Sequence, residues 1–346
     1  MASPSRALEP TRTGAQLRAD RLVGLVGRVR ELGLLIALAA IVAVVGAQQS
    51  RFLTASNARQ ILLAVSILAI LAVGQTLVVL TRSVDLSVAS MVGLVAYVAG
   101  SILRDNPGFS VPLVVLIGCA LGMGLGAVNG ALVTVGRVPA IVATLGTLYV
   151  FRGIDYWIAS GKQVVVADVP QSYRDIARTR VSGVPTPIIF AAVIALLVAY
   201  ALRYTRVGRQ LYAIGSNPDA ARLAGIRSGR LVFGAFVASG LLAGIGGILW
   251  GSRFGAIDAR AASGYELQVV AAVVVGGVNI FGGSGTVMGA VLGAVLLGTI
   301  ANALTILRLN PFWLQAISGG AILVAVTIDL LITRRLQQAL IARRHR

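Results

Sequence analysis

The chain consists mainly of long apolar segments separated by short polar or glycine- and proline-rich interruptions. A helix needs about 20 apolar residues to cross the hydrocarbon core of a membrane. Windows of this length, cut where charged or polar runs interrupt them, predict ten spans. The spans lie near residues 31–48, 58–80, 86–103, 112–135, 139–160, 186–202, 231–250, 266–281, 286–306 and 313–332. All should be helical, because a helix leaves no backbone group unpaired in hydrocarbon.

Composition supports the same fold class. Of 346 residues, 57% are hydrophobic and 12% are charged, whereas a soluble domain has about 25% charged residues. The fold expected is therefore all-α, a polytopic integral membrane protein. The one cysteine, Cys119, lies in an apolar run, and the one histidine, His345, lies near the C-terminus. We predict no disulfide within the chain, no metal site and no catalytic residue, because these chemistries need partners that the chain lacks.

Basic residues predict the orientation of the chain rather than a nucleic-acid partner, although the formal net charge is +18. With the N-terminus inside, 19 of the 30 basic residues fall in cytosolic segments. Arginine and lysine accumulate on the cytosolic side of membrane proteins. Together with an even number of spans, this bias predicts that both termini are cytosolic. The expected organisation is a basic arm (1–30), a transmembrane domain (31–333) and a basic tail (334–346).

Small residues form two notable patterns. Gly118, Gly122, Gly126 and Gly130 recur every four residues along one span, which lets helix backbones approach closely. This stripe predicts either close packing within one subunit or, alternatively, a subunit interface or a moving seam. The glycine-rich segment 276–284 superficially resembles a phosphate loop, but Gly283 stands where the lysine belongs, and a span precedes it instead of a strand. We therefore predict a tight turn there, and no cofactor bound by this chain.

A polar set within the spans is the candidate translocation path. Asp85 is its main member, because a carboxylate in hydrocarbon is costly unless it has a function or a partner. Pairing with Arg82 or capping of a helix start would explain Asp85 equally well. Hydrogen bonds between helices would explain half or more of the neutral members. The predicted path residues are Gln75, Asp85, Ser87, Asn129, Thr144 and Asn302.

A basic polar segment, 203–230, separates the sixth and seventh spans on the predicted cytosolic side. Ser216 or Asn217 can cap a helix, Pro218 suits its first turn, and Asp219 favours its positive end. An alanine-rich stretch follows as far as Gly225. The pattern predicts a short, stiff surface helix over 216–226.

This segment also carries a resemblance to a known family. Residues 205–209 (Thr-Arg-Val-Gly-Arg) and 213–226 (Ala-Ile-Gly-Ser-Asn-Pro-Asp-Ala-Ala-Arg-Leu-Ala-Gly-Ile) resemble the coupling segment of sugar-type ABC importer permeases, in the ribose, xylose, rhamnose and autoinducer-2 branch. Three further segments match in the same order: 84–90, 129–147 and 276–285. One departure concerns Arg82-Ser83-Val84, where many members have Gly-Gly-Ile. There the chain is more similar to the rhamnose and autoinducer-2 members.

The resemblance implies a ten-helix permease in the bacterial cytoplasmic (inner) membrane, surrounded by lipid. Its partners would be an ABC ATPase that uses ATP, an extracytoplasmic sugar-binding protein and a second permease subunit, identical or related. The residues expected to couple the chain to the ATPase are Gly208, Gly215, Asn217, Pro218, Ala220, Ala221, Ala224 and Gly225.

The predicted function is import of a monosaccharide or similar small polyol, powered by the separate ATPase. An alternative is an ion- or proton-coupled secondary transporter in which Asp85 carries the coupling ion. That mechanism is typical of inverted repeats with matched broken helices, and we find no such repeat in the sequence. An intramembrane enzyme would need a nucleophile or metal constellation within the spans, and the sequence offers none.

Overall fold

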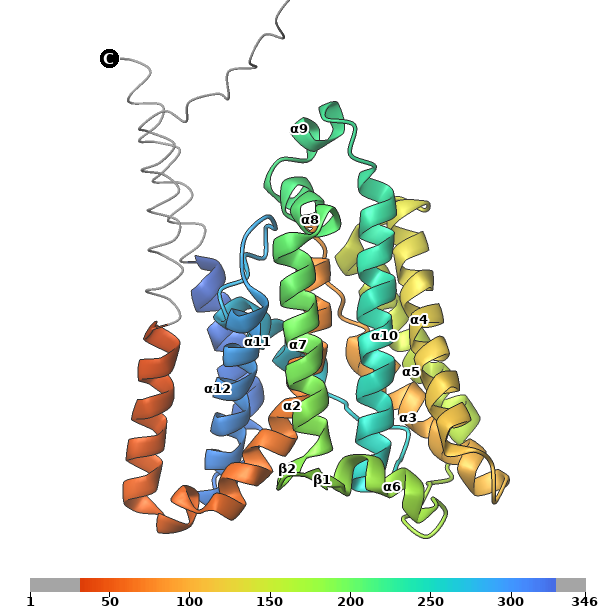
Figure 1. The fold of residues 1–346 in the computed structure, drawn as a ribbon, viewed down its shortest axis with the longest axis vertical. Helices are drawn as coiled ribbons and strands as arrows, with labels where there is room; N and C mark the ends of the chain where they lie inside the picture. The colour runs from red at the N-terminus through yellow and green to blue at the C-terminus, as the bar shows by residue number, and fades with distance from the viewer. Residues whose placement is uncertain (1–31, 328–346) are drawn as a thin grey trace, which may run out of the picture.

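The structure is a computed structural model that describes residues 32–327. Within this range the chain forms a bundle of helices with one short hairpin (Figure 1). The helices are Leu32–Gln48, η1 Ser50–Leu53, α2 Ala55–Val79, α3 Val88–Asp105, α4 Val111–Thr134, α5 Ala140–Ala159, α6 Gln171–Arg178, α7 Thr186–Tyr204, α8 Arg206–Ser216, α9 Pro218–Leu223, α10 Ser228–Phe254, α11 Tyr265–Val275, α12 Val287–Ile306 and Trp313–Thr327. The hairpin pairs β1 Arg180–Val181 with β2 Val184–Pro185 in antiparallel register.

Each of the ten predicted spans contains a helix. Six helices in the described part of the chain are long and apolar enough to cross a membrane: α2, α3, α4, α7, α10 and α12. The prediction for 266–281 was too long, because α11 ends at Val275 and Gly277 takes a left-handed φ of 94°. The arm 1–30, the tail 334–346 and the last residues of the tenth span lie outside the described residues.

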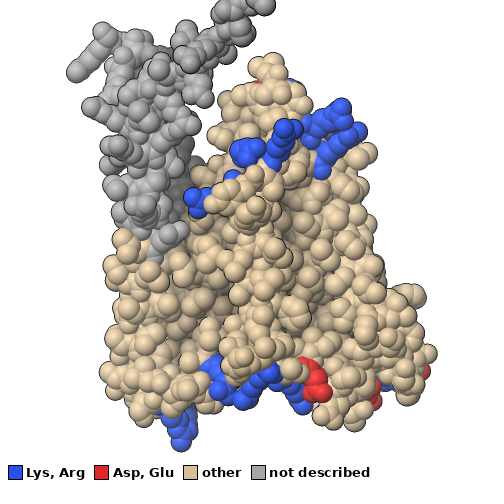
Figure 2. All heavy atoms as spheres, viewed as in Figure 1, with Lys and Arg blue, Asp and Glu red and all other residues tan. Residues whose placement is uncertain are grey.

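The two ends of the bundle differ in what they carry. Helices α8 and α9 stand at one end, and α6 with the hairpin lies at the other (Figure 1). Figure 2 shows charged side chains gathered at both ends of this face, with a broad uncharged band between them. A membrane protein needs such a band, because charge is costly in hydrocarbon. The chain is therefore a multi-pass membrane protein.

Helix α10 forms the centre of the bundle and packs against α2, α3 and α4. The predicted glycine stripe on α4 faces it: a Cβ on Gly122 would overlap the carbonyl oxygen of Gly240, and one on Gly126 would overlap that of Phe236. The close backbone approach replaces side-chain packing with extensive van der Waals contact. Of the two alternatives, the stripe thus serves packing within one subunit.

The chain between α2 and α3 is not helical. Helix α2 is buried along most of its second half and ends at Val79. The chain then turns through Arg82, which has a left-handed φ of 63°, and reaches α3 at Val88. This connection, residues 80–87, we call the break. It begins beside the end of α8, and its last residues belong to the buried polar cluster described below.

Candidate functional site: the coupling segment and the break

Helix α9 forms where the sequence predicted a surface helix, but it is shorter. The Oδ1 atom of Asn217 accepts a hydrogen bond of 3.0 Å from the backbone N–H of Ala220, and Pro218 occupies the first turn. The predicted range 216–226 was too long at both ends. Ser216 is the last residue of α8, and Gly225, with a φ of 76°, ends the turn that follows α9.

Helix α8 was not predicted from the sequence. The hydroxyl of Thr205 accepts a hydrogen bond of 3.1 Å from the Gly208 N–H and caps the helix start. Leu211 and Ile214 are buried on its inner face. Since α8 has 11 residues and α9 has 6, the longer ordered element of this segment lies before the predicted helix.

The C-terminal end of α8 is joined to the break by Arg82. Its Nε donates to the carbonyl of Gly215 at 2.6 Å, and its Nη2 donates to that of Ser216 at 2.9 Å. The last carbonyls of a helix lack partners within the helix and carry partial negative charge. A guanidinium fork therefore satisfies two of them together and neutralises the helix end.

The glycine-rich turn between α11 and α12 completes this junction. The N–H of Gly283 donates to the carbonyl of Leu80 at 3.1 Å, and the hydroxyl of Tyr212 donates to the carbonyl of Gly285 at 2.8 Å. Gly215 lies against both Leu80 and Gly283, and a Cβ there would overlap their backbones. The end of α8, the break and the glycine turn thus meet backbone to backbone.

The predicted coupling residues fall into two groups. Gly208 and Gly215 are buried on α8, where Gly208 packs against the carbonyl of Leu202. The others lie on α9 or beside it: Asn217, Pro218, Ala220, Ala221, Ala224 and Gly225. Within α9, Ala221 is buried and Leu223 is 90% exposed. The first group holds α8 in place, and the second presents a surface.

Asp85 is an internal acceptor within the break. Its Oδ1 atom accepts from the backbone N–H of Ser87 at 2.9 Å and from the Ser87 hydroxyl at 2.7 Å. This is the local turn that aspartate commonly stabilises before a helix. Asp85 thus stabilises a turn at Ser87, the residue before α3, and forms no ion pair with Arg82 and no hydrogen bond to an N–H of the first turn of α3. The Oδ2 atom of Asp85 is buried without a hydrogen-bond partner.

Neighbouring helices close around Asp85. Asn129 on α4 donates to the Ser87 hydroxyl at 2.8 Å, and Thr147 on α5 donates to Asn129 at 2.6 Å. The Thr144 hydroxyl donates to the carbonyl of Val84 at 3.0 Å. The amide of Gln75 on α2, oriented to satisfy both its atoms, donates to the Asp85 carbonyl at 3.2 Å and accepts from the Asp85 N–H at 3.1 Å.

Five of the six predicted path residues therefore lie together with Thr147. We call this group the Asp85 cluster: Gln75, Asp85, Ser87, Asn129, Thr144 and Thr147. The five predicted members have no exposed surface in this conformation. Asn302 lies apart, on α12, where it donates to Asn57 at 3.0 Å. The cluster links α2, α3, α4 and α5 through the break.

The described residues offer no group of three or more His, Cys, Asp and Glu that could hold a metal ion. Arg152 and Asp155 form an ion pair along one face of α5 at 3.8 Å. Arg82, Tyr212 and Thr147 belong to the site but were absent from the predicted site residues. The departure at Arg82-Ser83-Val84 was the one sequence signal for Arg82, whereas Tyr212 binds a backbone carbonyl 73 residues away and gives no local signal.

Comparison with known proteins gives consistent matches. Residues 57–327 match the family model described as "Branched-chain amino acid transport system / permease component". The ribose import permease protein RbsC of Escherichia coli (strain K12) is 37% identical over 299 residues, which is 85% of this chain and 92% of that protein. No solved structure matches the chain.

A second kind of relative is equally similar. The autoinducer 2 import system permease protein LsrC of Salmonella typhi is 37% identical over 300 residues, covering 87% of this chain and 85% of that protein. The corresponding protein of Yersinia enterocolitica is 38% identical over 308 residues. The family model and these relatives both cover most of the bundle. The chain therefore belongs to the family of transport-system permease components.

Proposed function

We propose that this chain is the permease subunit of an ABC importer that moves a monosaccharide or similar small polyol into the cytoplasm. Similarity to permeases of ribose and autoinducer 2 import systems supports this solute class. Its ten spans cross the bacterial inner membrane, and both termini are cytosolic. Residues 31–333 form the permease domain between the arm 1–30 and the tail 334–346.

The observation that carries the proposal is the junction of α8 with the break. An ATPase outside the membrane must transmit its movement mechanically to the spans. Helix α9, with its exposed Leu223, supplies a contact surface. Arg82 and Gly215 then join α8 to the break that holds the Asp85 cluster. Segment 203–230 thus receives the movement, and residues 80–87 pass it to four helices.

Similarity to permeases of ribose and autoinducer 2 import systems supports three proposed partners. A separate ABC ATPase binds and hydrolyses ATP and docks on the end that carries α9. An extracytoplasmic binding protein delivers the solute to the end that carries α6. A second permease subunit, identical or related, completes the path. In the proposed cycle the Asp85 cluster and Asn302 line or control this path. A binding-protein-fed permease needs only weak contacts with the solute there.

The proton-coupled alternative assigns a different role to Asp85. A coupling carboxylate must exchange a proton with water during each cycle. Asp85 has no exposed surface, and its Oδ1 atom is held by Ser87. These contacts favour a structural role for Asp85.

The test is uptake in proteoliposomes that contain the permease, its ATPase and its binding protein. We expect labelled D-ribose, L-rhamnose or a related sugar to accumulate when ATP is supplied on the α9 side. Accumulation should continue when an uncoupler collapses any proton gradient. An ATPase that binds but cannot hydrolyse ATP is the control. Uptake that stops with the uncoupler while ATP remains would overturn the importer assignment and make Asp85 the coupling site.

A further inference from the structure

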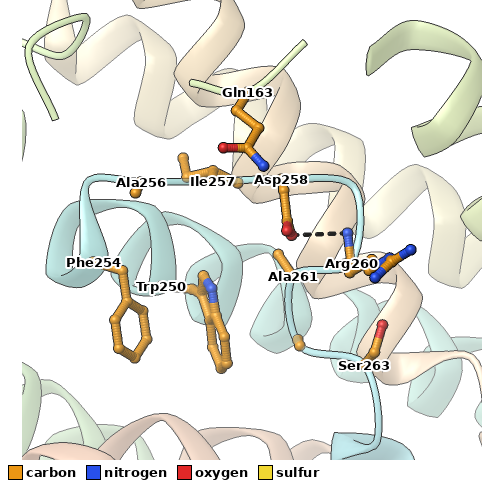
Figure 3. Close-up of a pocket in the computed structure, with 10 residues that line it drawn as sticks. Gln163, Trp250, Phe254, Ala256, Ile257, Asp258, Arg260, Ala261 and Ser263 are labelled. Atoms are coloured by element: carbon orange, nitrogen blue, oxygen red, sulfur yellow. Dashed lines mark hydrogen bonds between the residues drawn. The ribbon is translucent and has the colours of Figure 1, made fainter. Parts of the chain in front are cut away.

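A pocket of about 500 Å³ opens where the loop 255–264 joins α10 to α11 (Figure 3). The loop pairs with the chain just before α6, because Val164 and Ile257 exchange two backbone hydrogen bonds of 2.9 Å. The pocket therefore lies toward the end of the bundle that carries α6 and away from α8 and α9. In the proposed orientation, this is the end at which the solute arrives.

Aromatic rings and polar side chains line this outer pocket together. Trp250 and Phe254 come from neighbouring turns of α10, with ring centroids 4.8 Å apart. Tyr265 supports Trp250 edge-on at 5.0 Å. The polar lining consists of Gln163, Asp258, Arg260 and Ser263. Figure 3 shows the two rings on α10 beside the loop and the Gln163 amide directed toward Asp258.

The backbone of the loop is held in one shape before any ligand arrives. Arg152 on α5 reaches across and donates to the carbonyls of Ala259 and Ala261 at 3.0 and 2.9 Å. Left-handed residues, Gly255 and Gly264, begin and end the loop with φ of 67° and 88°. A fixed loop reduces the entropy lost on binding, because few groups have to be ordered.

The polar lining has unused hydrogen-bonding capacity. One oxygen of Asp258 accepts from the backbone N–H of Arg260 at 2.9 Å. Within the described residues, the side chains of Gln163, Arg260 and Ser263 form no hydrogen bond or ion pair. The Asp85 cluster is the opposite case, since most of its donors and acceptors bind one another. The outer pocket therefore has groups available for a solute, whereas the buried cluster has few.

We propose that the outer pocket is a weak binding site for a neutral monosaccharide or polyol released from the binding protein, an inference that rests on the proposed function. A sugar ring presents hydroxyl groups at its edge and C–H groups on its faces. Carboxylate, amide and guanidinium groups bind the hydroxyls, and an aromatic face packs against the C–H groups. The adjacent Asp258 and Arg260 carry opposite charges, which suits a neutral solute. Exposure of the pocket limits its affinity to about the millimolar range.

The test is saturation-transfer NMR on the permease–ATPase complex in lipid nanodiscs without binding protein. D-ribose, L-rhamnose and D-xylose are the probes. At least one should receive saturation, and Asp258→Asn or Gln163→Ala should weaken its binding about tenfold. The first replaces a charged acceptor with a weaker neutral one, and the second removes a hydrogen-bonding amide. The matched controls, Asp175→Asn and Gln171→Ala, change the same residue types on α6 outside the pocket and should leave binding unchanged.

Two further measurements decide the outcome. They are capture of the binding protein by the pocket variants and uptake by the intact importer. In the NMR experiment, equal sugar binding by the pocket variants and the wild type would overturn the inference. So would pocket variants that lose capture of the binding protein but keep sugar binding, because the pocket would then be a protein-docking surface. Uptake by the intact importer is measured in parallel. If a sugar is imported with ATP but shows no saturation transfer, the pocket assignment is wrong and the proposed function stands. If none of the probe sugars is imported with ATP, the proposed function is wrong.

Discussion

At the scale of single residues, Asp85 is a buried acceptor whose hydrogen bonds come mainly from Ser87, two positions away in the sequence. Its Oδ1 atom holds the Ser87 N–H and hydroxyl, and Asn129 reaches it from α4 at 3.4 Å. A turn of this kind depends on the acceptor oxygen of the side chain more than on its negative charge. The shape of the side chain should therefore be more important than its ionisation.

We expect Asp85→Asn to retain part of the ATP-driven uptake and Asp85→Leu to lose nearly all of it. Asparagine keeps an oxygen for the Ser87 N–H, whereas leucine leaves the buried N–H and hydroxyl of Ser87 without their acceptor, at about 1–3 kcal/mol each. Uptake is measured together with the yield of folded complex. Equal loss in both variants, with folded yields unchanged, would indicate that the charge itself is required.

Arg82 is a residue whose role depends on partners 133 and 134 positions away. We expect Arg82→Ala to lower solute uptake per ATP hydrolysed, because α8 is no longer joined to the break. Arg82→Lys should retain part of the coupling, since lysine donates but cannot form the two-pronged contact. The matched control is Arg209→Ala, which removes an exposed arginine whose side chain, among the described residues, donates to the carbonyl of Tyr204 alone. A normal uptake-to-hydrolysis ratio in Arg82→Ala would exclude the role.

At the scale of elements, hydropathy predicted where the helices lie, and six of those described are long and apolar enough to cross a membrane. Runs of apolar residues give this signal because burial in hydrocarbon requires them. Helix α8 escaped prediction because it lies on the surface with Gly208 and Gly215 inside it, and glycine lowers helix propensity. The end of α11 was misplaced because Ile280 and Phe281 continue the apolar pattern after the helix has ended. The outer pocket was invisible in the sequence, since its residues come from two distant segments.

We expect Gly122→Ala to destabilise the bundle by about 1–3 kcal/mol, because its methyl group has no room against α10. Gly124→Ala is the control, two residues along the same helix, where a Cβ meets nothing within 4 Å. Thermal unfolding of the detergent-solubilised permease measures both. Equal stability of the two variants would contradict the close α4–α10 contact.

Helix α9 is the element expected to touch the ATPase. We expect Leu223→Asp to abolish recovery of the ATPase on co-purification, because an apolar contact worth about 1.5–3 kcal/mol is replaced by a charge. Val135→Asp is the control, since Val135 is 81% exposed after α4, outside the coupling segment. Bulk at the buried Ala221, as in Ala221→Trp, should have a similar effect. Full recovery with Leu223→Asp would contradict docking at α9.

At the scale of the whole molecule, every proposed role depends on orientation: α9 must face the cytosol and α6 the outside. Cys119 is the only cysteine, so a Cys119→Ala background allows single cysteines to report their side of the membrane. We expect Gln171→Cys to react with an impermeant maleimide on intact cells, because Gln171 is exposed on α6. Leu223→Cys should react only after permeabilisation. Labelling of Leu223→Cys on intact cells would place α9 outside, where no cytosolic ATPase can dock, and would reverse the roles assigned to both ends.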